Sequence, residues 1–346
     1  MKKFFAEFKE FIAKGNVMTM AVGIVIGAAF TAIVTSLVND IITPLIGIII
    51  GGIDFSSIAI TVGESSLMFG NFIQAIINFL ITAFVLFLIV KSFNKFSELR
   101  KKEEEEAAVR VLRSGWLTTG NETHEFEREF AEKIKSPYAL AVNSNTSGMI
   151  LAMEACGVGP GKAVITTPYT FVSTAASARH LGADVYFADI EKDTYSIDPA
   201  SIEKILQSER GKNVVAVVPV HIAGNICDMK KINAIAKKYS IRVIEDCAHS
   251  FPSLTDDGYA GTLGDAGVFS FYATKTMTTG EGGMVTCRDE EIAKRITQMR
   301  LHGMNRDAWD RYTSTKASWE YDIIAPGFKS NLPDILSAIG RVQLAK

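Results

Sequence analysis

The feature that most constrains this chain is a long segment that carries no positive charge. No lysine or arginine stands between Gly15 and Val90, whereas charged residues recur at ordinary frequency from Lys91 onward. A domain that folds in water keeps charged side chains on its surface, because charges are rarely buried. We therefore expect two regions, the first folded against lipid and the second against water.

Two apolar runs in the first region, 17–42 and 72–90, each approach the ~20 residues that a helix needs to cross a bilayer. Inside lipid every backbone amide must be bonded within its own segment, so both runs are predicted to be transmembrane α-helices. The positive-inside rule places both termini in the cytoplasm and the connecting loop outside. The cations that set this orientation flank the two runs: Lys2, Lys3, Lys9, Lys14, Lys91, Lys95, Arg100, Lys101 and Lys102.

Residues 1–14 carry aromatic side chains at helical spacing, among them Phe4, Phe8 and Phe11. This pattern predicts an amphipathic helix in the membrane interface, with a cytosolic helix packed on the rest of the chain as the alternative. Because no small-residue cleavage site follows at the expected distance, the N-terminus is not predicted to be a cleavable signal peptide.

The first apolar run contains a GxxxG motif, formed by Gly23 and Gly27, which allows close helix packing but identifies no function. The whole stretch FKEFIAKGNVMTMAVGIVIGAAFTAIVTSLVNDIITPLIG, followed by GGIDF, FGNFIQAIINFLITAF and KKEEEE, resembles the bacterial large-conductance mechanosensitive channel. The resemblance covers about residues 1–106. It implies a homopentamer in the bacterial inner (plasma) membrane, gated by tension and weakly selective, with its apolar gate at Met20, Gly23 and Ile24.

Two other interpretations of these features stay open. Two spans without a buried charge also fit a small membrane anchor, and Met20 and Ile24 are also ordinary packing residues of a membrane helix. In the channel family a cytoplasmic helix that bundles the five chains follows the acidic tail. We expect that helix to be absent here, because other sequence begins after residue 108.

In the second region, short β-branched runs alternate with helical stretches. The runs at 163–167, 214–220, 242–246 and 267–271 predict strands, and 123–134, 201–207 and 229–239 predict helices. This alternation is typical of an α/β domain with a mainly parallel sheet. Because ligands of such sheets bind at the carboxyl ends of the strands, the residues that follow the strands are candidates. They are His221, Gly224, Asp246, His249, Ser270, Tyr272, Lys275 and the GEGG cluster at 280–283.

Taken singly, each candidate has an ordinary explanation, since a loop lysine is usually a surface charge and a strand-end aspartate is usually a helix cap. Together with their surroundings they resemble the sugar-nucleotide (DegT-type) aminotransferases. The motifs are NSNTSGM (143–149), TTPYTFVSTA (166–175), PVHIAGNICDM (219–229), VIEDCAHS (243–250), FSFYATKTMTTGEGGMVT (269–286) and PGFKSNLPDI (326–335). The match runs from about Val109 to Lys346 and implies the aspartate-aminotransferase fold with pyridoxal 5'-phosphate as cofactor.

The resemblance also implies a role for each motif residue. Lys275 is the catalytic residue and carries the cofactor covalently, Asp246 pairs with the pyridine nitrogen, Phe171 stacks on the ring, and His249 lies near the ring hydroxyl. Thr146, Ser147 and Ser270 hold the phosphate. Asn331 reaches the phosphate of the partner subunit in a homodimer. This chain departs from the family's pattern at Asn145, where the family often has glycine. His221 either lines the site or has a structural role.

We therefore predict a helical membrane domain over 1–102, an acidic junction over 103–108 and an incomplete aminotransferase large domain over 109–346. The family's small C-terminal domain, roughly another hundred residues, is expected to be missing. Three functions stay open: a channel subunit with a cytoplasmic passenger, a membrane-tethered aminotransferase using glutamate and a nucleotide sugar, and a chimera or gene-model join.

Composition excludes some classes of partner. The net charge of −2 gives no reason to expect a nucleic-acid partner. The four cysteines (Cys156, Cys227, Cys247 and Cys287) have no paired CxxC spacing, so we expect reduced thiols and no metal site.

Overall fold

The computed structural model describes residues 27–29, 31–42, 44, 58, 60–62, 65–67, 69–305 and 321–346. The chain divides into two compact units, Met1–Arg100 and Lys101–Lys346. Each unit is described by itself. The predicted gate residues Met20, Gly23 and Ile24, and the amphipathic helix over 1–14, lie outside the described residues.

The regular structure described in the first unit is helical apart from one small hairpin. An apolar helix covers Gly27–Ile42 and its last part, η1 (Leu37–Ile42), is π-helical. Strands β1 (Ile60–Val62) and β2 (Ser65–Leu67) pair antiparallel, and helix α4 begins at Phe69. Among the described residues, one helical segment, Phe69–Ser92, is long and apolar enough to cross a membrane.

Helix α4 (Phe69–Ser114) continues without a break through the acidic segment 103–108. The predicted absence of the channel family's bundling helix beyond this point stays a prediction, because α4 itself ends at Ser114. The continuation of α4 through the acidic segment has a local reason: glutamate, alanine, lysine, leucine and arginine are all strong helix formers. A lysine–glutamate pair four residues apart, Lys102 and Glu106, lies on this part of the helix at 3.7 Å.

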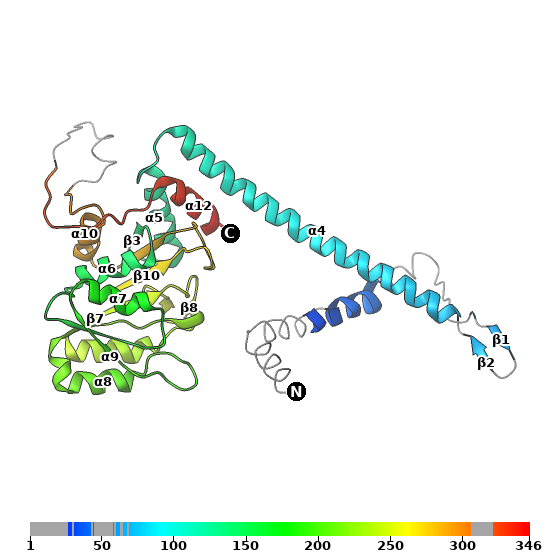
Figure 1. Ribbon diagram of the computed structural model, residues 1–346, viewed down its shortest axis with the longest axis horizontal. Coiled ribbons are helices and arrows are strands. Elements are labelled where there is room, and N and C mark those ends of the chain that lie inside the picture. Colours follow the sequence, from blue (N-terminus) through cyan, green and yellow to red (C-terminus); the bar gives the residue numbers. More distant parts are fainter. Residues whose placement is uncertain are drawn as a thin grey trace, which may run out of the picture. The chain divides into compact units, whose positions relative to one another are not determined.

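The second unit is built on a seven-stranded sheet (Figure 1). In this sheet β11 pairs antiparallel with both of its neighbours, β10 and β3, and the other described pairs are parallel, so the predicted mainly parallel sheet is confirmed. In spatial order the strands are β3 (Tyr138–Val142), β11 (Gly283–Cys287), β10 (Ala266–Ser270), β7 (Arg242–Cys247), β6 (Val214–Val217), β4 (Ala163–Thr166) and β5 (Asp184–Phe187). A separate two-stranded sheet pairs β8 (Leu254–Thr255) with β9 (Gly258–Tyr259).

Helices cover both faces of this sheet. They are α5 (Asn121–Ile134), α6 (Asn145–Ala155), α7 (Val172–His180), α8 (Pro199–Gln207), α9 (Met229–Tyr239), α10 (Glu290–Met299) and α12 (Asp334–Leu344), with 3₁₀ turns η2 (Glu209–Asn213) and η3 (Ile222–Gly224). The three predicted helices correspond to α5, α8 and α9, with α9 matching at both ends.

Successive residues of a strand point to opposite faces, and this alternation divides the core into layers. Val268 of β10 packs on the α6 and α10 side, whereas its neighbour Phe269 packs with Phe126 and Phe130 of α5. A third cluster joins α8 and α9 to β4 and β6. With helices on both faces, the accessible edge for a ligand is the carboxyl end of the strands.

Candidate active site

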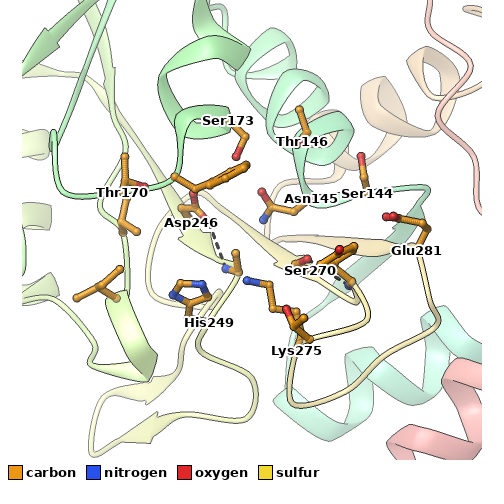
Figure 2. A pocket seen from close by; sticks show the side chains of 17 residues that line it. Ser144, Asn145, Thr146, Thr170, Ser173, Asp246, His249, Ser270, Lys275 and Glu281 are labelled. Atoms are coloured by element: carbon orange, nitrogen blue, oxygen red, sulfur yellow. Dashed lines mark hydrogen bonds between the residues drawn. The ribbon is translucent and has the colours of Figure 1, made fainter. Parts of the chain in front are cut away.

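A cavity of about 680 Å³ lies where strands β7 and β10 end, next to the loops that follow β3, β4 and β6 (Figure 2). Most of the predicted site residues meet there. The lining residues are Ser144, Asn145, Thr146, Thr170, Phe171, Ser173, Val220, Ile222, Asp246, Ala248, His249, Ser270, Tyr272, Thr274, Lys275, Glu281 and Gly282.

One wall of the cavity is the N-terminus of α6. Ser144 is the N-cap of this helix, and its hydroxyl oxygen accepts the amide of Ser147 at 3.1 Å. The side chain of Asn145 is tied inward, because its Nδ2 donates to the carbonyl of Val268 at 2.8 Å. The free amides and positive dipole of a helix N-terminus favour a bound anion, so this wall suits a phosphate group.

Among the predicted phosphate ligands, Thr146 and Ser270 line the cavity and Ser147 does not. The Ser147 hydroxyl accepts a hydrogen bond from Ser144, at 3.1 Å. Sequence reasoning missed Ser144, although a serine directly before a helix is a recognisable capping signal. The assignment of Ser147 therefore stays a prediction, and Ser144 joins the candidates.

Asp246 lies on the cavity floor at the end of β7 and is 4% exposed. Its Oδ2 accepts the Thr174 hydroxyl at 2.7 Å, and its Oδ1 accepts the amide of Ala248 at 3.1 Å. These two donors hold the carboxylate in one orientation. A buried carboxylate with free lone pairs suits a protonated ring nitrogen, because such a pair compensates the cost of burying the charge.

Lys275 enters the cavity from the loop after β10, and Figure 2 shows it on the same side as His249 and Asp246. Burial lowers the pKa of the Lys275 amine, because loss of water disfavours the charged form, while the carboxylate of Asp246 opposes this shift. A lowered pKa increases the fraction of neutral amine. Lys275 is therefore suited to act as a nucleophile.

His249 lies beside Lys275 in the cavity. Burial lowers the pKa of its imidazole, and the positive charge of Lys275 lowers it further. Its Nδ1 accepts the backbone amide of Ala223 at 3.4 Å. Since Nδ1 is the acceptor in this bond, the neutral ring carries its proton on Nε2, a tautomer inferred from the hydrogen bond.

Phe171 and Asn331 occupy different environments. Phe171 lines the cavity and is 74% exposed, as expected of a ring that can cover a flat ligand. Asn331 lies outside the cavity lining, where its Nδ2 donates to Thr119 at 2.7 Å and its Oδ1 accepts Lys329 at 2.6 Å. Its predicted role across a dimer interface stays a prediction.

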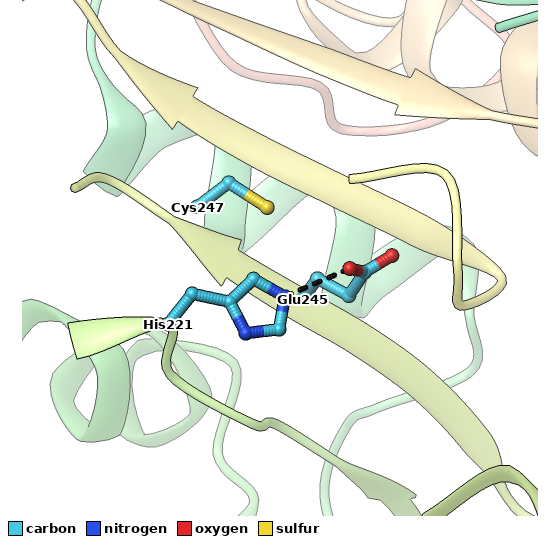
Figure 3. Close-up of side chains that lie close together, drawn as sticks. All are labelled: His221, Glu245 and Cys247. Atoms are coloured by element: carbon cyan, nitrogen blue, oxygen red, sulfur yellow. Dashed lines mark hydrogen bonds and ion pairs between the residues drawn. The ribbon is translucent and has the colours of Figure 1, made fainter. Parts of the chain in front are cut away.

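His221, Glu245 and Cys247 form a fully buried cluster under the sheet's carboxyl edge (Figure 3). Sequence spacing did not reveal this group. Glu245 accepts His221 Nε2 at 2.8 Å and also the amides of Gly261, Leu263 and Gly264 at 2.7–2.9 Å. Its lone pairs are thus occupied, which makes it a poor metal ligand. Of the two roles considered for His221, the structural one fits.

Two family models match the chain. The model described as "DegT/DnrJ/EryC1/StrS aminotransferase family" matches residues 98–346, and "Large-conductance mechanosensitive channel, MscL" matches residues 4–119. Both matches extend beyond the limits inferred from motifs, so they overlap over residues 98–119. The overlap coincides with the end of α4 and the start of the second unit.

Individual relatives agree with the first of these families. The Bacillus subtilis (strain 168) spore coat polysaccharide biosynthesis protein SpsC is 46% identical over 245 residues, which are 71% of this chain and 62% of that protein. The aminotransferase from Psychrobacter cryohalolentis matches with a TM-score of 0.64 and 35% identity, over 70% of this chain and 61% of that one. Spr1654 of Streptococcus pneumoniae in its PLP-form matches with a TM-score of 0.64 and 30% identity, over 70% and 64%. The chain thus spans less than two thirds of the length of these relatives.

Proposed function

The chain belongs to the DegT/DnrJ/EryC1/StrS aminotransferase family through residues 98–346, and on this premise we propose that its second unit binds a sugar nucleotide and transfers an amino group to it. Overall, the amino group of glutamate and the carbonyl oxygen of a keto sugar would change places, which gives an amino sugar and the 2-keto acid of glutamate. The name of SpsC, a polysaccharide biosynthesis protein, supports a sugar substrate. The observation that carries the proposal is the meeting of Lys275, Asp246 and the α6 N-terminus in one cavity.

The cofactor is pyridoxal 5'-phosphate, and the residues of the cavity fit its phosphate and its ring. Ser144, Thr146 and the α6 amides suit the phosphate, while the buried Asp246 suits the ring nitrogen. When bound, the cofactor supplies an electron sink for the bond changes at the substrate carbon.

The side chains of this unit would share the remaining work. Asp246 would hold a proton at the ring nitrogen, and its bonds to Thr174 and Ala248 keep it in position. Lys275 Nζ would anchor the cofactor and then move protons, which its lowered pKa favours. Phe171 would cover the ring face, and the Nε2–H of His249 would face the ring hydroxyl.

Covalent trapping tests this assignment. The full chain, purified in detergent and incubated with pyridoxal phosphate, is reduced with borohydride and digested, and the adduct is mapped. We expect the adduct on Lys275 and its complete loss in Lys275→Ala. The exposed Lys212→Ala serves as the matched control. An adduct at another lysine, or none on folded protein at saturating cofactor, refutes the site.

A second candidate function belongs to the first unit, which we propose is a subunit of a tension-gated channel with two spans and both termini in the cytoplasm. The match to the channel family over residues 4–119 and the segment Phe69–Ser92, which is long and apolar enough to cross a membrane, support it. A five-subunit ring would place Met20, Gly23 and Ile24 at an apolar constriction, where tension favours the wider state.

Two measurements test the channel proposal. A cysteine at position 56 should react with an impermeant reagent from outside the cell, and one at position 97 should not. Ile24→Lys should open at lower tension in patch recordings, because a charge wets the constriction. An unchanged threshold with the protein present in the membrane removes Met20 and Ile24 from the gate.

A further inference from the structure

Two exposed tyrosines contact each other, and one of them, Tyr169, directly precedes Thr170 of the cavity lining. The rings of Tyr169 and Tyr195 lie 5.6 Å apart between centroids, with an angle of 37° between their planes. Tyr169 is 50% exposed and Tyr195 is 54% exposed. Large aromatic side chains are usually more buried than this, and two of them touching each other in water form a flat apolar surface.

Both tyrosines are connected to the cavity by neighbouring residues. Tyr169 directly precedes Thr170, which lines the cavity and bonds to Thr174 at 2.8 Å, the same residue that donates to Asp246. On the other side, Asn225 follows the turn η3, whose Ile222 lines the cavity, and Asn225 Nδ2 donates to the carbonyl of Thr194 at 3.3 Å.

The backbone of Tyr195 is held in an unfavourable conformation. Its φ is +57°, in the left-handed region that residues other than glycine rarely adopt. The loop is fixed there by the bond from the Tyr195 amide to Glu191 O at 3.0 Å and by the bond from Thr194 Oγ1 to Glu191 Oε2 at 2.7 Å. Backbone strain of this kind costs free energy and gathers at ligand sites, so it indicates that the position of the Tyr195 ring matters.

We propose that the Tyr169–Tyr195 pair is a stacking platform for the base of a nucleotide ligand. The proposal rests on the function given above for the second unit and adds the residues that would recognise the nucleotide. Figure 2 shows Thr170, the neighbour of Tyr169 in sequence, on the side of the cavity away from Ser144 and Glu281. A ligand whose sugar occupies the cavity would extend its base past Thr170 to the tyrosine pair.

Planar bases bind well to such a surface. Nucleobases stack on tyrosine faces, and this contact accepts any base because every base has a π face. The pair thus predicts affinity for the nucleoside part with little discrimination between bases. A second copy of this chain would also cover exposed rings, and the experiment separates that occupant from the nucleotide.

The test compares uridine diphosphate with inorganic pyrophosphate, which has the charge but no base. Both are titrated calorimetrically into the full chain in detergent, with and without pyridoxal phosphate. We expect Tyr195→Ala and Tyr169→Ala to weaken uridine diphosphate binding about tenfold each. Pyrophosphate binding should stay unchanged. Tyr195→Phe and Tyr169→Phe keep the rings and should bind uridine diphosphate as the unaltered chain does.

The outcomes are decisive in both directions. Unchanged uridine diphosphate binding in both alanine variants overturns the proposal, as does equal loss of pyrophosphate binding. If the alanine variants instead lower the oligomeric state in sedimentation, a second copy is the occupant and the proposal is wrong. If no cofactor attaches to Lys275, the proposed function fails, while the titrations without cofactor still decide the stacking site.

Discussion

The same type of side chain has opposite positions in the two units of this protein. Phe79 of α4 is 69% exposed within the segment Phe69–Ser92, whereas Phe130 of α5 is completely buried among Phe126, Phe269 and Phe271. In the second unit, burial of apolar surface away from water stabilises the fold. In the first, apolar side chains facing outward are expected only where lipid replaces water. The positions of apolar side chains therefore indicate whether a region is surrounded by water or by lipid, as well as where its core lies.

The largest effect expected from this comparison is on the stability of the second unit. Phe130→Ala removes a ring in contact with four others and leaves a cavity, at a cost of about 3–5 kcal/mol. Phe79→Ala, the matched control on the exposed face of α4, should leave this stability unchanged. The measurement is the urea midpoint of cofactor release from the full chain in detergent. Equal shifts for both variants would break the distinction between the units.

A smaller effect, with a definite direction, is expected on the pH midpoint of cofactor attachment to Lys275. Imine formation requires the neutral amine, so its rate rises with pH, and burial of Lys275 should place the midpoint below the ~10.4 of a free lysine. Asp246 raises the pKa of Lys275, so Asp246→Asn should move the midpoint to still lower pH. Stopped-flow absorbance measures this rate, with Asp257→Asn as a surface control. A midpoint that rises in Asp246→Asn contradicts the assigned geometry.

The smallest effect should come from the junction between the regions. Arg110, on the last turns of α4, forms an ion pair with Glu122 of α5. The Arg110 side chain is 59% exposed, so water screens this pair. Arg341 also binds Glu122, at 2.8 Å, so Arg110→Ala leaves the carboxylate paired. We expect a loss of less than about 1 kcal/mol in the same urea assay. A loss as large as that of Phe130→Ala would show that α4 is essential to the second unit.

Much of the second unit was predictable because its signals are local. Strands and helices followed from runs of β-branched residues and helical periodicity, and α9 matched at both ends. Motif resemblance correctly named the aminotransferase family, and Lys275, Asp246 and His249 indeed share one cavity. The continuation of α4 to Ser114 follows from local helix propensity as well.

What only the tertiary structure decided are contacts between residues far apart in the chain. The N-terminus of α5 has no side-chain cap of its own, and Asp334 caps it by accepting the amides of Gly120 at 2.7 Å and Thr123 at 3.1 Å. The saturation of Glu245 and the meeting of Tyr169 with Tyr195 depend likewise on loops brought together by the sheet. Sequence determines local conformation through short-range sterics and periodicity. Partners distant in the chain are chosen only when packing of the whole fold sets the distances between them.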